Sequence, residues 1–244
     1  MLLACYGRAG GECVTPEEFI RRSGPNYREK GIFPYCPGCD ERVDPYGVHS
    51  TNVTSRFDHQ NLDEAIDPLD DCLEANRSGR FRGMHADGWD DERGQRLRDE
   101  FFEPDNLKQA YAFCLAICRK GNLTAGQFAE LIARADRKSI WAYKDIPLWV
   151  IPYVLLTLGN FGAGANARYP FHFVLKKNRS QGLSQIWQTG EHRCSIGKVF
   201  SNSGEPVNTL GNPYPINHQY LIDTAGDTGW IETRLLRALS AAGQ

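Results

Sequence analysis

Four side chains that are typical metal ligands lie within a short, loop-rich stretch near the start of the chain. Cys36 and Cys39 form a Cys-x-x-Cys motif, and one imidazole, His59, and a further thiol, Cys72, follow it. The tight turn of such a motif lets two thiolates reach one tetrahedral ion, about 2.3 Å from each sulfur when the ion is zinc. The sequence therefore predicts one zinc ion bound by Cys36, Cys39, His59 and Cys72.

This set of ligands favours a structural role for the ion. Four protein ligands fill the tetrahedron of zinc and leave no position for a reactive water. The surrounding stretch also has too few apolar residues to fold unaided, so metal binding would supply folding free energy. His49 is an alternative to His59 as the imidazole ligand, and Cys13 is an alternative to Cys72 as the fourth. A simpler reading is that the cysteines are small buried hydrophobic residues.

The composition limits the classes of function. The 28 basic and 30 acidic side chains leave a net charge of -2, so no global positive field draws the chain to a phosphate backbone. We identify no secretory signal, and we expect a cytoplasmic protein in which clustered cysteines bind metal rather than form disulfides. The most hydrophobic stretch, residues 148–158, is well short of the roughly 20 residues that cross a bilayer. We expect no membrane association.

The elements that would position these ligands are short. Residues 2–6 are apolar and predict a strand, and Thr15 before Pro16 and two acids predicts the start of a helix through about Arg22. Turn-forming residues and short β-like pieces then extend to Cys72. We expect a zinc-ribbon-like module over residues 1–75 and a polar linker or surface loop over residues 76–94.

A larger α+β domain is expected over residues 95–244. Apolar residues recur at helical spacing from Leu97 to Cys118, with a break near Pro104, and a second helix is predicted over residues 124–135 with Thr124 and Gln127 as a capping box. Residues 140–158 form an apolar, aromatic segment that is helical after Pro147. Strands are predicted over residues 171–175 and 194–201, followed by a loop over 204–215 and a closing helix over 231–242.

A basic patch in the last third of the chain is a candidate nucleic-acid surface. Cations can hold a phosphate backbone while an aromatic side chain, here Trp187, stacks on a base. The alternative is a solvated strand end. A second basic stretch, Arg80 to Arg98, is interleaved with acids and is typical of a solvated surface. The candidate phosphate-binding residues are Lys176, Lys177, Arg179, Arg193 and Lys198.

Some residues of the same region are also compatible with catalysis. Cys194 as nucleophile, His192 or His218 as base and Asp223 as orienting acid would make a hydrolase site, although the spacing does not require it. A cysteine in a predicted strand is more often a packed core residue.

The N-terminal region resembles the zinc-ribbon-like region of the competence protein CoiA family. The likeness rests on an apolar strand, a short helix, the Cys-x-x-Cys motif, Phe57 two residues before His59, and the later Cys72. It covers roughly residues 1–75, and here Tyr35 directly precedes the first cysteine of the motif. The resemblance implies a link to DNA uptake and processing. After residue 75 we identify no strand with an acid followed by a Glu-x-Lys or Gln-x-Lys pair, so the nuclease activity of that family is not implied.

Three functions remain open at this point. The first is a non-catalytic, zinc-containing nucleic-acid-binding or adaptor protein in bacterial DNA processing or phage defence. The second is a hydrolase or nuclease with structural zinc. The third is a protein-interaction subunit of a larger complex.

Overall fold

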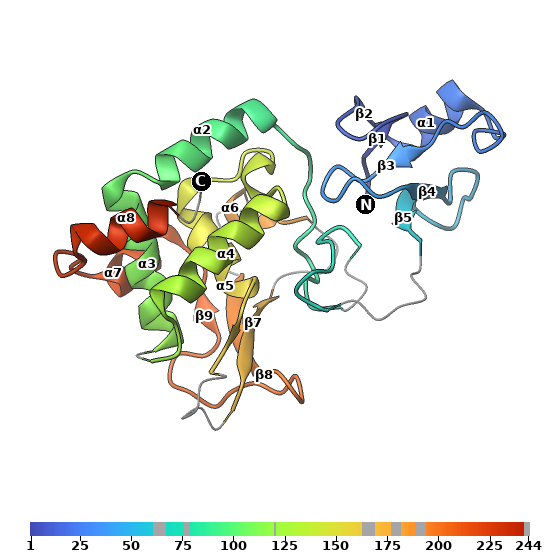
Figure 1. The fold of residues 1–244 in the computed structure, drawn as a ribbon. Helices are drawn as coiled ribbons and strands as arrows, with labels where there is room; N and C mark the ends of the chain where they lie inside the picture. The colour runs from blue at the N-terminus through green and yellow to red at the C-terminus, as the bar shows by residue number, and fades with distance from the viewer. Residues whose placement is uncertain are drawn as a thin grey trace.

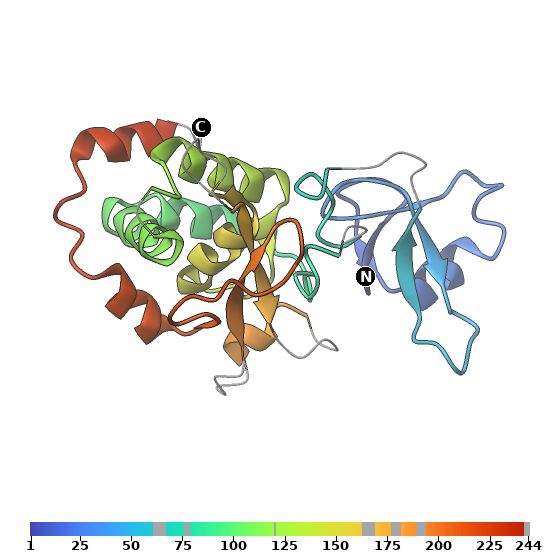
Figure 2. The same ribbon diagram turned by 90° about the horizontal axis from the view of Figure 1, so that it is seen from below.

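The computed structural model describes residues 1–60, 67–75, 79–119, 121–162, 169–176, 182–188 and 194–241. Its helices and antiparallel sheets form an α+β fold, as predicted. The first 60 residues form a small lobe, and the chain from residue 79 onward forms a larger one (Figures 1 and 2). A separate cluster of buried side chains fills each lobe.

The small lobe contains a three-stranded sheet, a helix and a hairpin. The sheet has the antiparallel order β2-β1-β3, with β1 (Ala4–Tyr6) between β2 (Cys13–Val14) and β3 (Pro34–Tyr35). Helix α1 (Pro16–Ser23) follows β2, and β4 (Val43–Tyr46) pairs with β5 (Arg56–His59).

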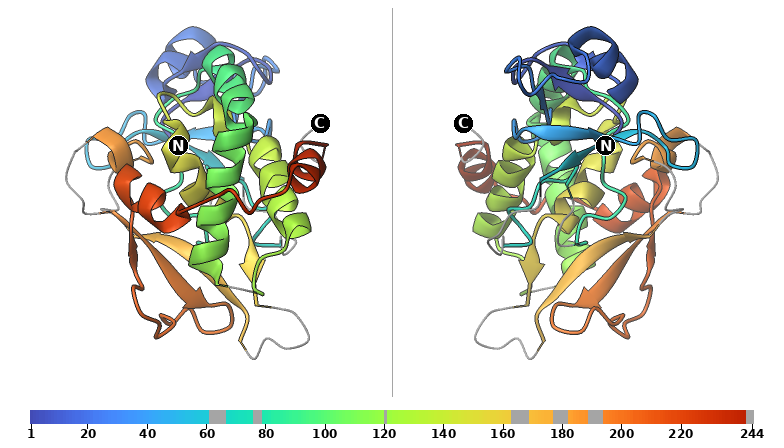
Figure 3. Two further views of the ribbon diagram at one scale, coloured as in Figure 1. Left: turned by 90° about the vertical axis from the view of Figure 1, so that its left-hand side faces the viewer. Right: turned by 90° about the vertical axis from the view of Figure 1, so that its right-hand side faces the viewer.

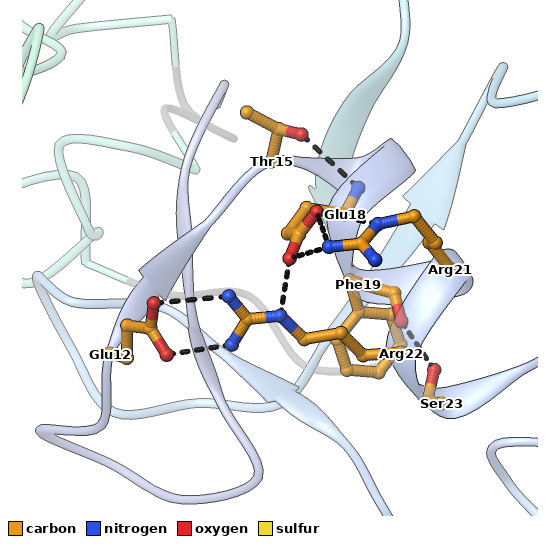
Figure 4. A network of polar contacts seen from close by, with 7 residues as sticks. All are labelled: Glu12, Thr15, Glu18, Phe19, Arg21, Arg22 and Ser23. Atoms are coloured by element: carbon orange, nitrogen blue, oxygen red, sulfur yellow. Dashed lines mark hydrogen bonds and ion pairs between the residues drawn. The ribbon is translucent and has the colours of Figure 1, made fainter.

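Helix α1 begins where the sequence predicts it. The Thr15 hydroxyl accepts a hydrogen bond from the Glu18 backbone N–H (3.2 Å), which satisfies one of the donors left open at a helix start. On the solvent side Arg22 bridges Glu18 and Glu12 (Figure 4). On the other side Phe19 is fully buried, so its ring packs the helix against the core of the lobe.

The larger lobe is built around buried helices. In α3 the side chains of most residues from Leu107 to Cys118 are buried, as expected for a helix that is apolar nearly all round. The predicted capping box of Thr124 and Gln127 is confirmed. Each of the described helices is too short or too polar to cross a bilayer. The helices are α2 (Asp91–Phe101), α3 (Pro104–Cys118), α4 (Ala125–Arg137), α5 (Ile151–Thr157), α6 (Gln185–Gln188), α7 (His218–Ala225) and α8 (Thr233–Ala241), with 3-10 turns at Ile140–Ala142 and Leu148–Val150.

A four-stranded antiparallel sheet completes the larger lobe. Its order is β6-β7-β8-β9, formed by Asn160–Phe161, Phe171–Lys176, Ser195–Phe200 and Tyr214–Pro215. The helices pack on one side of this sheet, which lies at the lower end of the views in Figure 3. The predicted strands and the closing helix are confirmed, whereas α7 was not predicted.

The segment predicted as a linker is packed where the structure describes it. Phe81 and Met84 are buried in the core of the larger lobe, and Asp90 caps α2, which begins inside the predicted linker. The segment was predicted as a linker because its average composition is polar. Its few apolar side chains, such as Phe81 and Met84, are nevertheless buried. Residues 79–90 lie on the side of the larger lobe that faces the small one (Figures 1 and 2).

The crossing of α2 over the Ile140–Ala142 turn depends on Gly94. A Cβ at this position would lie 2.8 Å from the Ala142 Cα, closer than real Cβ contacts. We expect Gly94→Ala to destabilise the larger lobe by about 1–3 kcal/mol through overpacking, although alanine is the better helix former. Thermal or urea unfolding would measure the change.

Gly126 provides the matched control, since it lies in α4 with no atom near its would-be Cβ. Gly126→Ala should leave stability unchanged or raise it by up to about 1 kcal/mol. Equal effects of the two substitutions would contradict the packing argument.

Candidate metal centre

The structure brings the four predicted ligands together. The ligand atoms of Cys36, Cys39, His59 and Cys72 all lie within 4.8 Å of one another, and they form the one such group found among the described residues. The Cys36 and Cys72 sulfurs are 3.8 Å apart. The Cys39 sulfur lies 3.4 Å from the His59 Nε2.

These separations fit a tetrahedral ion. With zinc–sulfur bonds of about 2.3 Å and zinc–nitrogen bonds of about 2.0–2.1 Å, neighbouring ligand atoms lie about 3.8 Å apart for two sulfurs and about 3.5 Å apart for a sulfur and a nitrogen. Both observed separations are close to these values. Three soft sulfur donors and one imidazole favour a metal such as zinc over magnesium or calcium, which prefer oxygen ligands.

Backbone hydrogen bonds hold the Cys-x-x-Cys turn. The Cys36 N–H donates to the Glu41 carbonyl (2.8 Å), and the Asp40 N–H donates to the Cys36 carbonyl (2.9 Å). The Gly38 N–H also points at the Cys36 sulfur (3.3 Å). A hydrogen bond from a backbone N–H to sulfur stabilises the thiolate form, and Gly38 supplies one to Cys36.

His59 reaches the site because of the register of the hairpin. It lies opposite Val43, two residues after the buried Phe57, and residues two apart on a strand share a face. The ring is therefore placed on the inner side of the β4–β5 pair, facing the core of the small lobe.

Cys72 connects the site to the larger lobe. Its side chain is in the core of the small lobe, whereas the next residue, Leu73, is in the core of the larger one. The preceding carbonyl, that of Asp71, accepts a hydrogen bond from the Lys138 ammonium (2.6 Å), and Lys138 is buried at the end of α4. An ion at this site would therefore join the two lobes.

The pKa shifts of the thiols differ in direction across the cluster. Hydrogen bonds from Cys36 and then Cys39 lower the pKa of Cys72 well below the usual range for a thiol. The hydrogen bonds to Cys39 and Cys72 raise the pKa of Cys36 in turn. Cys72 is therefore the thiol of the cluster that most readily takes the thiolate form, which is the form that binds metal. Three thiolates and a neutral imidazole would leave one negative charge on a divalent ion, and the Lys138 ammonium lies close enough to Cys72 to interact with it.

The two alternative ligands lie elsewhere. Cys13 is opposite Cys5 in the β1–β2 pair. His49 is in the loop between β4 and β5, where it lines a hollow of about 540 Å³ together with Tyr46 and Val53. Neither belongs to the cluster of four ligands.

The structure changes the predicted phosphate-binding set. Lys177, Arg179 and Arg193 lie outside the described residues, and Lys176 is exposed at the end of β7. Lys198 is only 5% exposed, and its ammonium lies 3.5 Å from the centre of the Phe171 ring. Burial lowers its pKa. Lys198 faces the interior of the larger lobe and cannot reach a ligand in solvent, so it is removed from the set.

Two arginines that the sequence suggested were merely solvated lie beside Lys176. Arg80 and Arg82 line a hollow of about 410 Å³ whose opposite wall is formed by residues 174–176 of β7. Arg82 also lines an adjacent hollow of similar volume, which it shares with Arg56 of the small lobe and with His85. We name the two hollows together the basic groove.

The absence of a side chain at Gly197 determines where the Lys176 side chain lies. A Cβ on Gly197 would lie 2.6 Å from the Lys176 Cε, so the bare backbone of β8 lets the lysine side chain lie across it. The pairing of Gly197 with Val174 in the β7–β8 ladder places this contact beside the wall of the groove.

The described members of the set considered for catalysis show no triad among their recorded contacts. His192 lies outside the described residues, and Cys194 is buried. His218 stacks on Trp149, and Asp223 accepts a hydrogen bond from Gln219 (2.8 Å). The structure gives no support to a nucleophile and base at this place.

Comparison of the chain with protein-family models, with curated proteins and with solved structures finds no match. The resemblance to the CoiA family stays an expectation from the sequence.

We expect Cys36→Ser to release the metal, because it removes a buried sulfur ligand that accepts a hydrogen bond from the Gly38 N–H and lies 3.8 Å from the Cys72 sulfur. Zinc content should fall from about one ion per chain to a small fraction of that. Residues 30–75 should become sensitive to protease, while the larger lobe, with its own core, stays resistant. Metal analysis and limited proteolysis with and without a chelator measure both effects.

Cys13→Ser is the matched control, the same change in the same lobe at the alternative ligand. It should keep the metal, as should His49→Gln, whereas His59→Gln should lose it. Retention of metal by Cys36→Ser, or loss from Cys13→Ser, would contradict the assignment of ligands.

Proposed function

We propose that this chain is a zinc-containing nucleic-acid-binding protein without catalytic activity. Zinc would hold the small lobe in its fold and against the larger lobe. The basic groove would contact the phosphate backbone.

The zinc assignment rests on the ligand set. Four protein ligands at tetrahedral spacing leave no open position, which is typical of a structural ion. The ion would then act on the groove only through the fold, by fixing the segment after Cys72 that carries Arg82.

The observation that carries the proposal is the convergence of cations from distant segments. Arg82 and Lys176 are both exposed and face one hollow, although 94 positions separate them in the chain. Arg80 lies deeper, where it donates hydrogen bonds to the Gly159 carbonyl (2.6 Å) and the Thr157 carbonyl (3.2 Å). Its charge also contributes to the lowered pKa of His172 on β7, after the larger effect of burial.

The groove suits phosphates rather than a particular sequence of bases. Arginine and lysine are the side chains that most often contact the phosphate backbone, and such contacts position a ligand without reading its sequence. The acidic total charge does not oppose this, since local clusters of cations determine where a polyanion binds.

Binding should weaken steeply as salt rises, because each neutralised phosphate releases counterions. We expect Arg82→Gln and Lys176→Gln each to lower affinity for labelled nucleic acid and to reduce the slope of log K against log salt, by about 0.7 on single strands or about 0.9 on duplex DNA. Fluorescence anisotropy with single-stranded DNA, duplex DNA and RNA, at four or more salt concentrations, would measure both quantities.

Arg96→Gln is the matched control, since it removes one exposed arginine charge on α2, away from the groove. It should leave the slope unchanged. Absence of salt-dependent binding, or equal losses in all three variants, would contradict the proposal. Cleavage of the nucleic acid in magnesium or manganese would favour the nuclease alternative instead.

A further inference from the structure

Two cysteines outside the metal centre are paired across the first sheet. Cys5 on β1 lies directly opposite Cys13 on β2. The Tyr6 N–H donates to the Glu12 carbonyl (2.9 Å), so Tyr6 and Glu12 form a hydrogen-bonded pair, and Cys5 and Cys13 are the next, non-hydrogen-bonded pair. The Cα atoms of such a pair are about 4.5 Å apart, within the range of about 4.4–6.8 Å that a disulfide spans.

The two thiols differ in access to solvent. Cys13 is exposed, whereas Cys5 is buried in the small lobe with 2% of its surface accessible. A hydrogen bond from Cys5 lowers the pKa of Cys13 to about 7. The exposed sulfur is therefore the one that a reagent in solution meets first, and a large share of it is thiolate at neutral pH.

We propose that Cys13 is a site of thiol–disulfide exchange with low-molecular-weight disulfides, and that Cys5 resolves the mixed disulfide to give a reversible Cys5–Cys13 bond. The exposed cysteine is the attacking residue, and the buried cysteine behind it is the resolving residue. No movement of the strands is needed, because the ladder already holds the two residues opposite each other.

The exchange balances with glutathione disulfide as the reagent. The Cys13 thiolate attacks one sulfur of the reagent and releases one glutathione thiolate. Cys5 then loses its proton to solvent, attacks the Cys13 sulfur and releases the second glutathione thiolate. The protein loses two hydrogens, and one glutathione disulfide becomes two glutathione thiols.

The other cysteines differ from this pair. Cys36, Cys39 and Cys72 would be held by the metal, Cys114 and Cys118 are fully buried in α3 of the larger lobe, and Cys194 is buried just before β8. Cys114 and Cys118 are also four residues apart on one helix, so no pairing of strands holds them opposite each other as it does Cys5 and Cys13.

Peptide mapping of the zinc-loaded, full-length chain tests the proposal. The protein is incubated with glutathione disulfide at neutral pH, quenched by alkylation and digested with trypsin, which cuts after Arg8 and so separates Cys5 from Cys13. We expect residues 1–8 and 9–21 to be recovered as one linked species, two hydrogens lighter than their sum, that separates on reduction. Zinc content, measured in parallel, should not change.

Two variants separate the roles of the cysteines. In Cys5→Ser the mixed glutathione disulfide should accumulate on Cys13 to about tenfold the wild-type level or more, because nothing resolves it. In Cys13→Ser the buried Cys5 should stay unmodified. The proposal is overturned if wild-type Cys13 stays unmodified or keeps glutathione without linking to Cys5, or if either cysteine links to a metal ligand.

Discussion

In the small lobe, three sulfur atoms and one ring nitrogen from separate points of the chain lie within 4.8 Å of one another. Its buried core, among the described residues, consists of Ala4, Val14, Phe19, Tyr27, Cys36, Val43, Phe57 and Cys72. Two of these are candidate metal ligands, and two others, Ala4 and Val14, lie on strands of only three and two residues. Strands this short contribute few hydrogen bonds and little buried area, so an ion that joined four separate points of the chain would add stability that the strands do not supply.

The same contact determines how the lobes are joined. The chain passes from one core to the other between Cys72 and Leu73, and the Lys138 ammonium holds the carbonyl just before this step. An ion would fix the Cys72 side chain in the small lobe, and the hydrogen bond from Lys138 fixes the Asp71 carbonyl to the larger lobe. The residues that follow, including Phe81 and Met84, are then packed into the larger core instead of forming a free tether. The junction between the lobes is therefore held by packing and by a hydrogen bond.

The ligand set could be predicted from the sequence because few side chains are good metal ligands. Thiols and imidazoles close in sequence in a segment poor in apolar residues have few other uses. The sequence favoured Cys72 over Cys13, but it could not exclude Cys13, because that depends on the sheet order β2-β1-β3, which pairs Cys13 with Cys5 through contacts between separate segments.

Two other features, the orientation of Lys198 and helix α7, were not predicted, and each has a cause in its own segment of the sequence. Strand β8 has buried residues on both faces, so alternation could not show that Lys198 points inward, opposite Phe173. Helix α7 was missed, although Asn217 caps it by accepting a hydrogen bond from the Tyr220 N–H (2.7 Å). Its mostly exposed residues gave no strong apolar period, and the cap was the one signal available.

The groove and the metal centre are physically linked even though they share no side chain. One hollow of the groove has Arg56 on one wall, from the strand that ends at His59, and Arg82 on the other, ten residues after Cys72. A metal that binds His59 and Cys72 at once therefore sets the distance between these two arginines. Any polyanion that contacts both of them would favour the same arrangement, and by linkage its binding and the binding of the metal would strengthen each other. Under the proposed function, a closed structural site would thus control binding at a surface that it does not touch.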